Sequence, residues 1–297
     1  MMKKIMSIAI AALTTANLYA AETYNIEAGA QYYTLSNDAN SKINMTAVGG
    51  TYYLKPIVMD GSQPFAEVDV LQKASGVSVH YMNMNTETAE LASTTVTPIQ
   101  LSGKFYVEDF VFSFSNFSYD KNFHTKANAA NYYGIKATSN AFAVGYWVLP
   151  STTVTFANAK TDSSYVRSTT SLANINDMNV TTNSVVSHTI ASLGGTQSVV
   201  LDFVYSQVKV DQSTTKNNTE YVGKVRYYPE AKYFVESEYT INHGDMVGNK
   251  GKTIMVGGGY SLTPRLVVML TTEKFNADDS SSKGSSKTST LTAGYRF

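Results

Sequence analysis

The chain has 297 residues, no cysteine and a formal net charge of zero, with 23 basic and 23 acidic side chains. This balance excludes a nucleic-acid binder, which needs an excess of Lys and Arg to neutralise phosphates. Beyond about the first twenty residues, the chain lacks the roughly eighteen consecutive apolar residues of a transmembrane helix. Tyr occurs 21 times and Phe 13 times, against one Trp and 6 Pro. Such aromatic enrichment, with abundant Ser, Thr and Asn, predicts an all-β protein with amphipathic strands.

The N-terminal segment predicts export. Lys3 and Lys4 precede a short apolar run over residues 5–13, and Ala20 and Ala21 supply the small residues of a cleavage site. We expect residues 1–21 to be a cleaved signal peptide and residues 22–297 to form one domain. A non-cleaved anchor is the alternative. Removing Lys3 and Lys4 leaves 21 basic against 23 acidic residues, a slight acidic excess in the mature chain.

Alternating hydrophobicity predicts strands along the mature chain. From residue 22, one face carries Tyr24, Ile26, Ala28, Ala30 and Tyr32, with aromatic residues bracketing small apolar ones. The same period of two recurs to the C-terminus. The strands expected from it are 22–35, 41–54, 64–85, 96–107, 109–119, 139–149, 152–162, 183–193, 197–210, 219–228, 231–243, 251–262, 264–276 and 286–297.

The connections between these strands fall into two lengths. Short turns alternate with longer polar segments near 86–95, 120–138, 163–182, 211–218, 243–250 and 277–286. Outer-membrane barrels have short periplasmic turns and longer external loops, whereas a soluble sandwich has no reason to sort its turns in this way. We therefore expect a closed antiparallel transmembrane β-barrel of about 14 strands, within a range of about 12–16. The segment 64–85 is long for one strand, and a turn or bulge at Ser75-Gly76 would change the count.

Two neighbouring strands carry the most informative charges. Lys224 and Arg226 share the polar face of one expected strand, and Glu236 and Glu238 share that of the next. A turn at residues 229–231 would place Lys224 opposite Glu236. One interpretation is ion pairs that support the wall and fix the register. The other is a charged constriction that filters ions.

Further charged residues fall on the polar faces and are candidates to line a pore. They are Glu27, Glu67, Asp69, Lys104, Asp109 and Asp202, with Glu220, Lys232 and Arg296 beside them. Together with the four residues above, acids outnumber bases, so we expect a weak preference for cations. The long segments 120–138 and 163–182 are the expected candidates for a loop that folds inward and narrows the pore.

The sequence offers little for an enzyme. It has four His residues and no Ser-centred Gly-x-Ser-x-Gly motif. His243-Gly244-Asp245 could pair a base with an orienting carboxylate, but a polar loop is the commoner meaning of such a run. The sequence suggests no cofactor, since no phosphate-binding glycine motif with its lysine is present, and no metal site, since no His pair has ligand spacing.

The C-terminal strand points to a class of protein. Leu291, Ala293, Tyr295 and Phe297 share one face and end the chain on an aromatic residue. This resembles the C-terminal signal of bacterial outer-membrane proteins, so we expect the barrel-assembly machinery to recognise Phe297. Outer-membrane lipid and lipopolysaccharide are the other expected partners. Asp278 and Asp279 could meet divalent cations at the lipopolysaccharide surface, although a solvated acidic loop is the simpler interpretation.

A narrower resemblance lies near the N-terminus. The segments Tyr52–Ile57, Pro64–Glu67 and Leu71–Ser75 resemble the N-terminal region of the general bacterial porin family, over about a tenth of the chain. Gln63 stands where the family has Gly before the Pro. The resemblance implies a pore and carries no catalytic or ligand-binding residue.

These observations predict an outer-membrane porin for passive diffusion of small hydrophilic solutes and ions. Fourteen strands leave more space than side chains fill, since eight is the number at which they just fill it. A substrate-selective channel and a structural or adhesive barrel with a closed lumen are the alternatives. Porins are often trimers, but single barrels of this size occur, so a homotrimer stays an open expectation.

Overall fold

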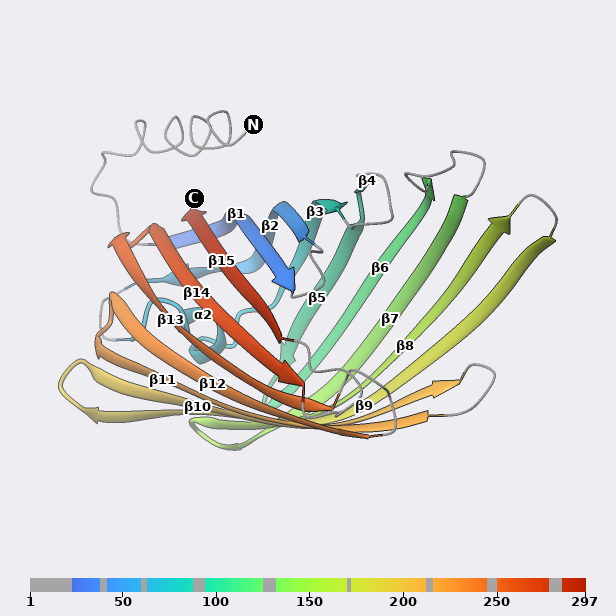
Figure 1. Ribbon diagram of the computed structural model, residues 1–297. Helices are drawn as coiled ribbons and strands as arrows, with labels where there is room; N and C mark the ends of the chain where they lie inside the picture. Colours follow the sequence, from blue (N-terminus) through green and yellow to red (C-terminus); the bar gives the residue numbers. More distant parts are fainter. Residues whose placement is uncertain are drawn as a thin grey trace.

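The computed structural model describes residues 23–37, 42–59, 63–87, 94–124, 132–169, 172–211, 216–244, 250–277 and 285–297. The expected signal peptide lies outside these residues. The strands form one antiparallel meander in which β1 also pairs with β15, so that the sheet closes (Figure 1). Among the described residues, no helix is long and apolar enough to cross a membrane.

The elements follow one another in simple order around the barrel. Their bounds are β1 Thr23–Asn37, β2 Lys42–Val58, α2 Val68–Leu71, β3 Gly76–Glu87, β4 Thr94–Val96, β5 Ile99–Val107, β6 Phe110–His124, β7 Tyr132–Leu149, β8 Thr152–Thr169, β9 Leu172–Gly194, β10 Gln197–Asp211, β11 Lys216–Glu230, β12 Tyr233–Gly244, β13 Gly251–Thr263, β14 Leu266–Ala277 and β15 Ser285–Arg296.

The wall has fourteen strands, as the sequence predicts, because β4 and β5 share one place in it. Both pair with β3: Met84 lies opposite Val96 of β4, and Tyr81 lies opposite Ile99 of β5. Pro98 lies between them and cannot donate a ladder hydrogen bond. Its carbonyl instead accepts a hydrogen bond from the Met82 N–H at 2.9 Å.

The outer face of the barrel is apolar. Alternate residues of the strands point outward, and the apolar ones that are at least 45% exposed include Val48, Val79, Leu101, Phe142, Phe156, Phe203, Val235, Val256, Leu270 and Leu291. A soluble monomer rarely exposes an apolar surface that encircles it. Lipid would bury this apolar surface. A closed sheet suits lipid as well, because every backbone polar group is paired with a neighbouring strand. Val225, expected to face lipid, is 44% exposed on this side.

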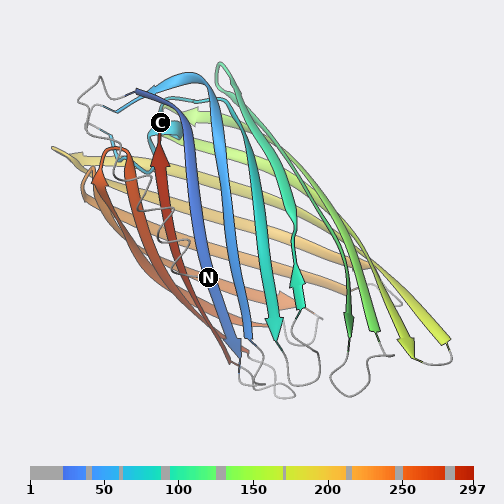
Figure 2. The same cartoon turned by 90° about the horizontal axis from the view of Figure 1, so that it is seen from above.

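The two ends of the barrel differ. Tight turns join the strands at Glu108–Asp109, Pro150–Ser151, Gly195–Thr196, Ala231–Lys232 and Pro264–Arg265. We call this the turn end, and β1 starts and β15 ends there. The opposite end, here the loop end, carries most of the longer connections, and Figure 2 shows the two ends well separated. The expected alternation of short and long connections fails at two places: only residues 170–171 separate β8 from β9 at the loop end, and the long segment 59–75 joins β2 to β3 at the turn end.

Two segments differ from the sequence-based expectation. The expected loop 163–182 is mostly strand, because β8 runs to Thr169 and β9 begins at Leu172. About 9–11 residues cross a membrane as a tilted strand, so the 23 residues of β9 extend well past the apolar belt. The outer face of β8 changes from Phe156, 64% exposed, to Asn158 and Lys160. Because the outward residues of this part are polar, the alternation of apolar and polar residues ends before the strand does, and the sequence did not predict the extra length. Likewise, much of 120–138 belongs to β6 and β7, and residues 125–131 lie outside the described part.

The expected strand 64–85 is also wrong in its first half. The chain leaves β2 after Val58, forms the single helical turn α2 and enters β3 only at Gly76. A β-bulge between Tyr24 and Ile26 has a related effect. It turns Tyr24 inward, where it is 3% exposed, whereas Ile26 points outward as expected. Both differences come from the same cause, which is a segment of chain folded into the lumen.

Candidate pore constriction

The turn-end part of the lumen holds a short internal segment, residues 63–75, which we call the wedge. It contains α2, visible inside the barrel behind β13 and β14 in Figure 1. Its helical turn is closed by hydrogen bonds from the Leu71 N–H to the Glu67 carbonyl and from the Gln72 N–H to the Val68 carbonyl, both 3.0 Å. One turn of helix has no stability of its own, so packing must hold it.

Apolar packing holds the wedge on two sides. Val68, Ala74 and Phe65 pack against Tyr24, Tyr53, Ile57 and Met59 of the β1–β2 region. Ala66, Val70 and Leu71 pack against Ile190, Val200, Tyr228 and Phe234 of β9–β12. Val68 is 2% exposed, and burial of such a side chain stabilises by about 1.5–3 kcal/mol. The wedge is therefore part of the folded core of the barrel.

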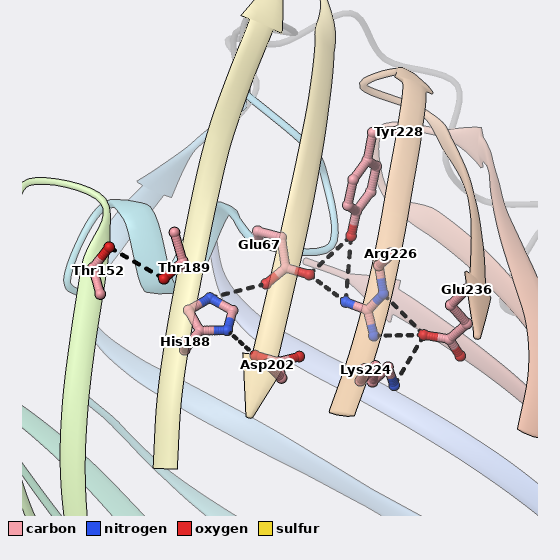
Figure 3. A network of polar contacts seen from close by, with 9 residues as sticks. All are labelled: Glu67, Thr152, His188, Thr189, Asp202, Lys224, Arg226, Tyr228 and Glu236. Carbon is pink, nitrogen blue, oxygen red and sulfur yellow. Dashed lines mark hydrogen bonds and ion pairs between the residues drawn. The ribbon is translucent and has the colours of Figure 1, made fainter. Parts of the chain in front are cut away.

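A buried polar network joins the wedge to the β9–β12 wall (Figure 3). The Glu67 carboxylate is 5% exposed and forms an ion pair with the Arg226 guanidinium. It also accepts a hydrogen bond of 2.9 Å from the Tyr228 hydroxyl. His188 Nε2 lies 3.8 Å from the other Glu67 oxygen, and His188 Nδ1 lies 2.5 Å from Asp202 Oδ1. A buried carboxylate needs such partners, because burial of an unpaired charge is costly.

The network continues along the wall to Glu236. Arg226 Nη2 and Lys224 Nζ each lie 2.9 Å from Glu236 Oε2, and the Glu236 side chain is 1% exposed. The Arg226 guanidinium also lies over the Phe234 ring, 4.7 Å from its centroid. Arg226 thus binds a carboxylate of the wedge and a carboxylate of the wall at once. Its planar fork of donors suits this double role better than a lysine would.

Further contacts clasp the wedge at its ends. The Gln72 side-chain amide donates to the Val58 carbonyl at 2.6 Å and accepts from the Val58 N–H at 2.9 Å, closing the loop between β2 and α2. Lys73 Nζ lies 2.7 Å from Asp109 Oδ1 and 5.3 Å from the Trp147 ring centroid. Lys73 itself has a positive φ of 48°, a cost that these contacts offset. On the other side, the Phe65 N–H donates a hydrogen bond of 2.9 Å to the Ala231 carbonyl, so the wedge contacts turns on both sides of the lumen.

The remaining side of the lumen is hollow. A cavity of about 420 Å³ lies between the wedge and the wall formed by β3 and β5–β8. Most inward side chains along it are small, including Ser78, Ser102, Ser113, Ser115, Ala141, Ala143 and Ala157. Its charged members are Asp69 of the wedge and Lys104 of β5, which lie within electrostatic reach of each other. We call this space the slot.

The structure distributes the expected pore-lining residues over five places. Asp69 and Lys104 lie in the slot. Glu67, Asp202, Lys224, Arg226 and Glu236 belong to the polar network, and Glu238 lies opposite Lys224 on β12. Glu27 pairs with Arg296 at 3.1 Å beside the wedge. Asp109 and Lys232 lie in exposed turns, where they pair with Lys73 and Glu230. Glu220 lies on β11 toward the loop end.

The expected register of β11 and β12, with Lys224 opposite Glu236, is wrong by two residues. Lys224 lies opposite Glu238, and Arg226 lies opposite Glu236, because the turn is Ala231–Lys232 and the register shifts between Tyr227 and Glu230. The ion pair between Lys224 and Glu236 is nevertheless present as a diagonal contact of 2.9 Å. The parity of the faces, which decides what points inward, was predicted correctly.

Sequence reasoning missed the wedge and its receptors His188 and Tyr228. It placed Glu67 and Asp69 on a strand, although Pro64 and the acidic residues of that segment are poor strand formers. That composition was the available signal. Residues 163–182 do not fold inward as expected but belong mostly to the strands β8 and β9. The described segment that narrows the lumen is the wedge, which enters from the turn end.

The described residues contain no group of three or more His, Asp or Glu side chains arranged to hold a metal ion. The expected pairing of His243 with Asp245 falls partly outside them, since Asp245 is not described. In the polar network, the Glu67 and Glu236 carboxylates face the Arg226 and Lys224 cations, and His188 Nε2 is buried without a hydrogen-bond partner. Chemically, the arrangement can hold the wedge and present the slot to solutes.

Comparison with known proteins supports the architecture. No family model matches the chain, and no curated protein matches it. Among solved structures, it is similar to the outer membrane protein Omp33 of Acinetobacter baumannii, with 18% identity over 94% of this chain and 100% of that one, at a TM-score of 0.58.

Two further structures are similar at lower identity. The monoaromatic hydrocarbon channel CymD aligns at 10% identity over 92% of this chain and 89% of its own, with a TM-score of 0.55. A mutant of the monoaromatic hydrocarbon channel TodX aligns at 9% identity over 94% and 92%, with a TM-score of 0.52. The resemblance to general porins finds no matching family. The fold shared with these proteins is that of a multi-pass outer-membrane β-barrel.

Proposed function

We propose that the chain is a porin of the bacterial outer membrane, forming a water-filled channel for passive diffusion of small hydrophilic solutes and ions. The observation that carries the proposal is the slot. A fourteen-strand barrel leaves space inside it, the wedge fills one side of the turn end, and the small side chains of β5–β8 leave the other side unfilled. Solutes would pass between Asp69 and the opposite wall.

The chemistry of the slot favours hydrated solutes. Hydroxyl groups of Ser78, Ser102, Ser113 and Ser115 line it, together with the charged side chains of Asp69 and Lys104. Such a lining can replace part of the hydration shell of a polar solute, whereas a hydrocarbon gains nothing from it. The slot is also narrow relative to the whole barrel, which would limit passage to small molecules.

Conductance in planar bilayers tests the proposal. Purified, folded protein should give stepwise currents that rise with salt concentration and do not saturate with added solute. Proteoliposomes should swell in small sugars and resist larger ones. Absence of steps would leave the barrel with a closed lumen, and saturating currents would indicate a substrate-selective channel. Either result contradicts passive diffusion.

A pair of matched variants localises the path. Ala141 lines the slot, whereas Ala30 lies on the lipid-facing side of β1 between Val48 and Ala293. Ala141→Trp should lower the unit conductance, because the added ring occupies the slot. Ala30→Trp makes the same chemical change outside the lumen and should leave conductance unchanged. Equal conductance in both variants would place the path elsewhere.

The C-terminal strand supports a second part of the proposal, which concerns assembly. Phe297 is 54% exposed, its ring lies 4.8 Å from that of Tyr295, and its carbonyl accepts a hydrogen bond from the Asn25 N–H at 3.0 Å. It therefore lies at the seam where the barrel closes. We propose that the assembly machinery recognises this residue before closure. Removal of Phe297 should lower the yield of folded barrel in the membrane while export continues, and a normal yield would contradict this role.

A further inference from the structure

Four lysines gather on the outer face at the loop end of β13–β15 and β2. They are Lys252, Lys274, Lys287 and Lys42, and all four are exposed. Lys274 and Lys287 lie directly opposite each other, Ser36 lies opposite Lys287, and Lys42 lies opposite Ser36. Neighbouring strands are about 4.8 Å apart, so this row, which crosses four strand spacings from β13 to β2, spans roughly 20 Å. We call these four residues the basic row.

The basic row lies above the apolar belt, one level of polar side chains away from it. Lys274 and Lys287 share their faces with Leu270 and Leu291, four residues along the same strands, which are 60% and 49% exposed. Hydroxyl and amide groups fill the level between, where Thr272 and Thr34 each lie opposite Ser289, and Asn44 lies opposite Thr34. From the centre of the belt outward, the surface therefore changes from apolar to hydrogen-bonding to cationic.

Lys274 and Lys287 place like charges directly opposite each other on antiparallel strands, which destabilises the pair. Among the residues whose side chains the structure describes, Lys252, Lys274 and Lys287 form no ion pair, whereas Lys42 lies opposite Glu87 on β3. Two other outward lysines are balanced, since on β8 and β10 Lys160 lies 3.2 Å from Asp162 and Lys209 lies 3.0 Å from Asp211. An external anion would remove the repulsion between Lys274 and Lys287.

We propose that the basic row binds the phosphate groups of an anionic glycolipid of the outer leaflet, with its acyl chains against Leu270 and Leu291. The order of the surface matches such an amphiphile, whose chains, amide and hydroxyl groups, and phosphates follow one another in the same direction. Basic residues at this level of a membrane attract anionic headgroups. The inference rests on the outer-membrane location and not on the channel, so loss of conductance would leave it unaffected.

Native mass spectrometry of the folded barrel in detergent tests the inference. Wild-type protein is titrated with bis-phosphorylated lipid A, with its dephosphorylated form and with a zwitterionic phospholipid. The test variant is Lys274→Gln/Lys287→Gln. The control is Lys160→Gln/Lys209→Gln, which removes the same charge from outward lysines that have carboxylate partners. Resistance of the barrel to unfolding in cold detergent confirms that each variant is folded.

Each lysine near an anionic headgroup contributes a factor of about five to binding, so the test variant should bind bis-phosphorylated lipid A roughly 25-fold more weakly. The control variant should bind within about twofold of wild type, because Lys160 and Lys209 pair with carboxylates and lie outside the basic row. Dephosphorylated lipid should bind wild type and test variant alike. Equal weakening in both variants, or binding that ignores the phosphates, would overturn the proposal. A change in the number of protein copies with unchanged lipid binding would assign the row to a protein interface instead.

Discussion

The two sides of the lumen at the turn end differ in the side chains that point inward and in whether the wedge covers them. On β9–β12, long charged and aromatic residues such as Arg226, Tyr228 and Phe234 reach inward and grip the wedge. On β5–β8, the inward positions carry Ser and Ala, and the wedge leaves them uncovered. Both walls have the same backbone pairing and the same alternation. The difference shows that side-chain volume, not strand geometry, decides where a barrel of this size stays open.

The two walls also differ in the energetic cost of a substitution. The gripping wall buries charge, and a buried charge is tolerated only with complete pairing. The hollow wall contributes hydroxyl and methyl groups that lose little when water or solute lies beside them. A substitution should therefore be destabilising on the gripping wall and should change permeation on the hollow wall.

The largest effect is expected from breaking the contacts of Glu67 with the β9–β12 wall. Glu67→Ala removes a carboxylate that pairs with Arg226 and accepts from Tyr228, and leaves the guanidinium buried beside Glu236 alone. Loss of one partner of a buried pair costs about 3–5 kcal/mol. Urea unfolding of the barrel in lipid vesicles measures the cost.

A matched control for this change is Glu230→Ala. Glu230 pairs with Lys232 in an exposed turn, with side chains about half exposed, and loss of such a pair costs less than about 1 kcal/mol. Equal destabilisation by the two substitutions would mean that the wedge is not held by Glu67.

The next largest effect comes from placing the same charge on the outer face or in the lumen. Val225→Arg places a cation in the apolar belt, which costs about 2–4 kcal/mol near the middle of the membrane. Ser115→Arg places the same side chain in the slot, where water can solvate it. Folding into vesicles should suffer in the first variant, and conductance should fall in the second. A neutral Val225→Arg would show that the assignment of faces is inverted.

How much of this could be foreseen depends on the range of the interactions. Period-two alternation placed Lys224, Arg226 and Glu236 on the inner face, because a strand repeats its environment locally. The wedge could not be foreseen in this way. Glu67 meets Arg226 across 159 positions of sequence, and no local pattern encodes such a contact. The bulge at Tyr24 was hidden for the same reason, since it follows from packing against the wedge.

The smallest effect concerns ion selectivity. Glu236 is held by Lys224 and Arg226 and is 1% exposed, so Glu236→Gln should change selectivity little. Asp69 and Lys104 face the slot and are the better probes. Asp69→Asn should lower the cation-to-anion permeability ratio and Lys104→Gln should raise it, each by less than about twofold at physiological salt, where the Debye length is about 8 Å. Reversal potentials in a salt gradient measure both, and shifts in the same direction would exclude these residues from the path.

The most direct test of the account uses the absence of cysteine from the chain. Ser113→Cys puts a thiol on the hollow wall, where Ser113 lines the slot. Ser198→Cys makes the same near-isosteric change on β10 of the gripping wall, where Ser198 is 8% exposed. A charged methanethiosulfonate reagent added during single-channel recording should reduce the current through Ser113→Cys and leave Ser198→Cys unchanged. Block of the second variant, or no block of the first, would contradict passage between the wedge and the hollow wall.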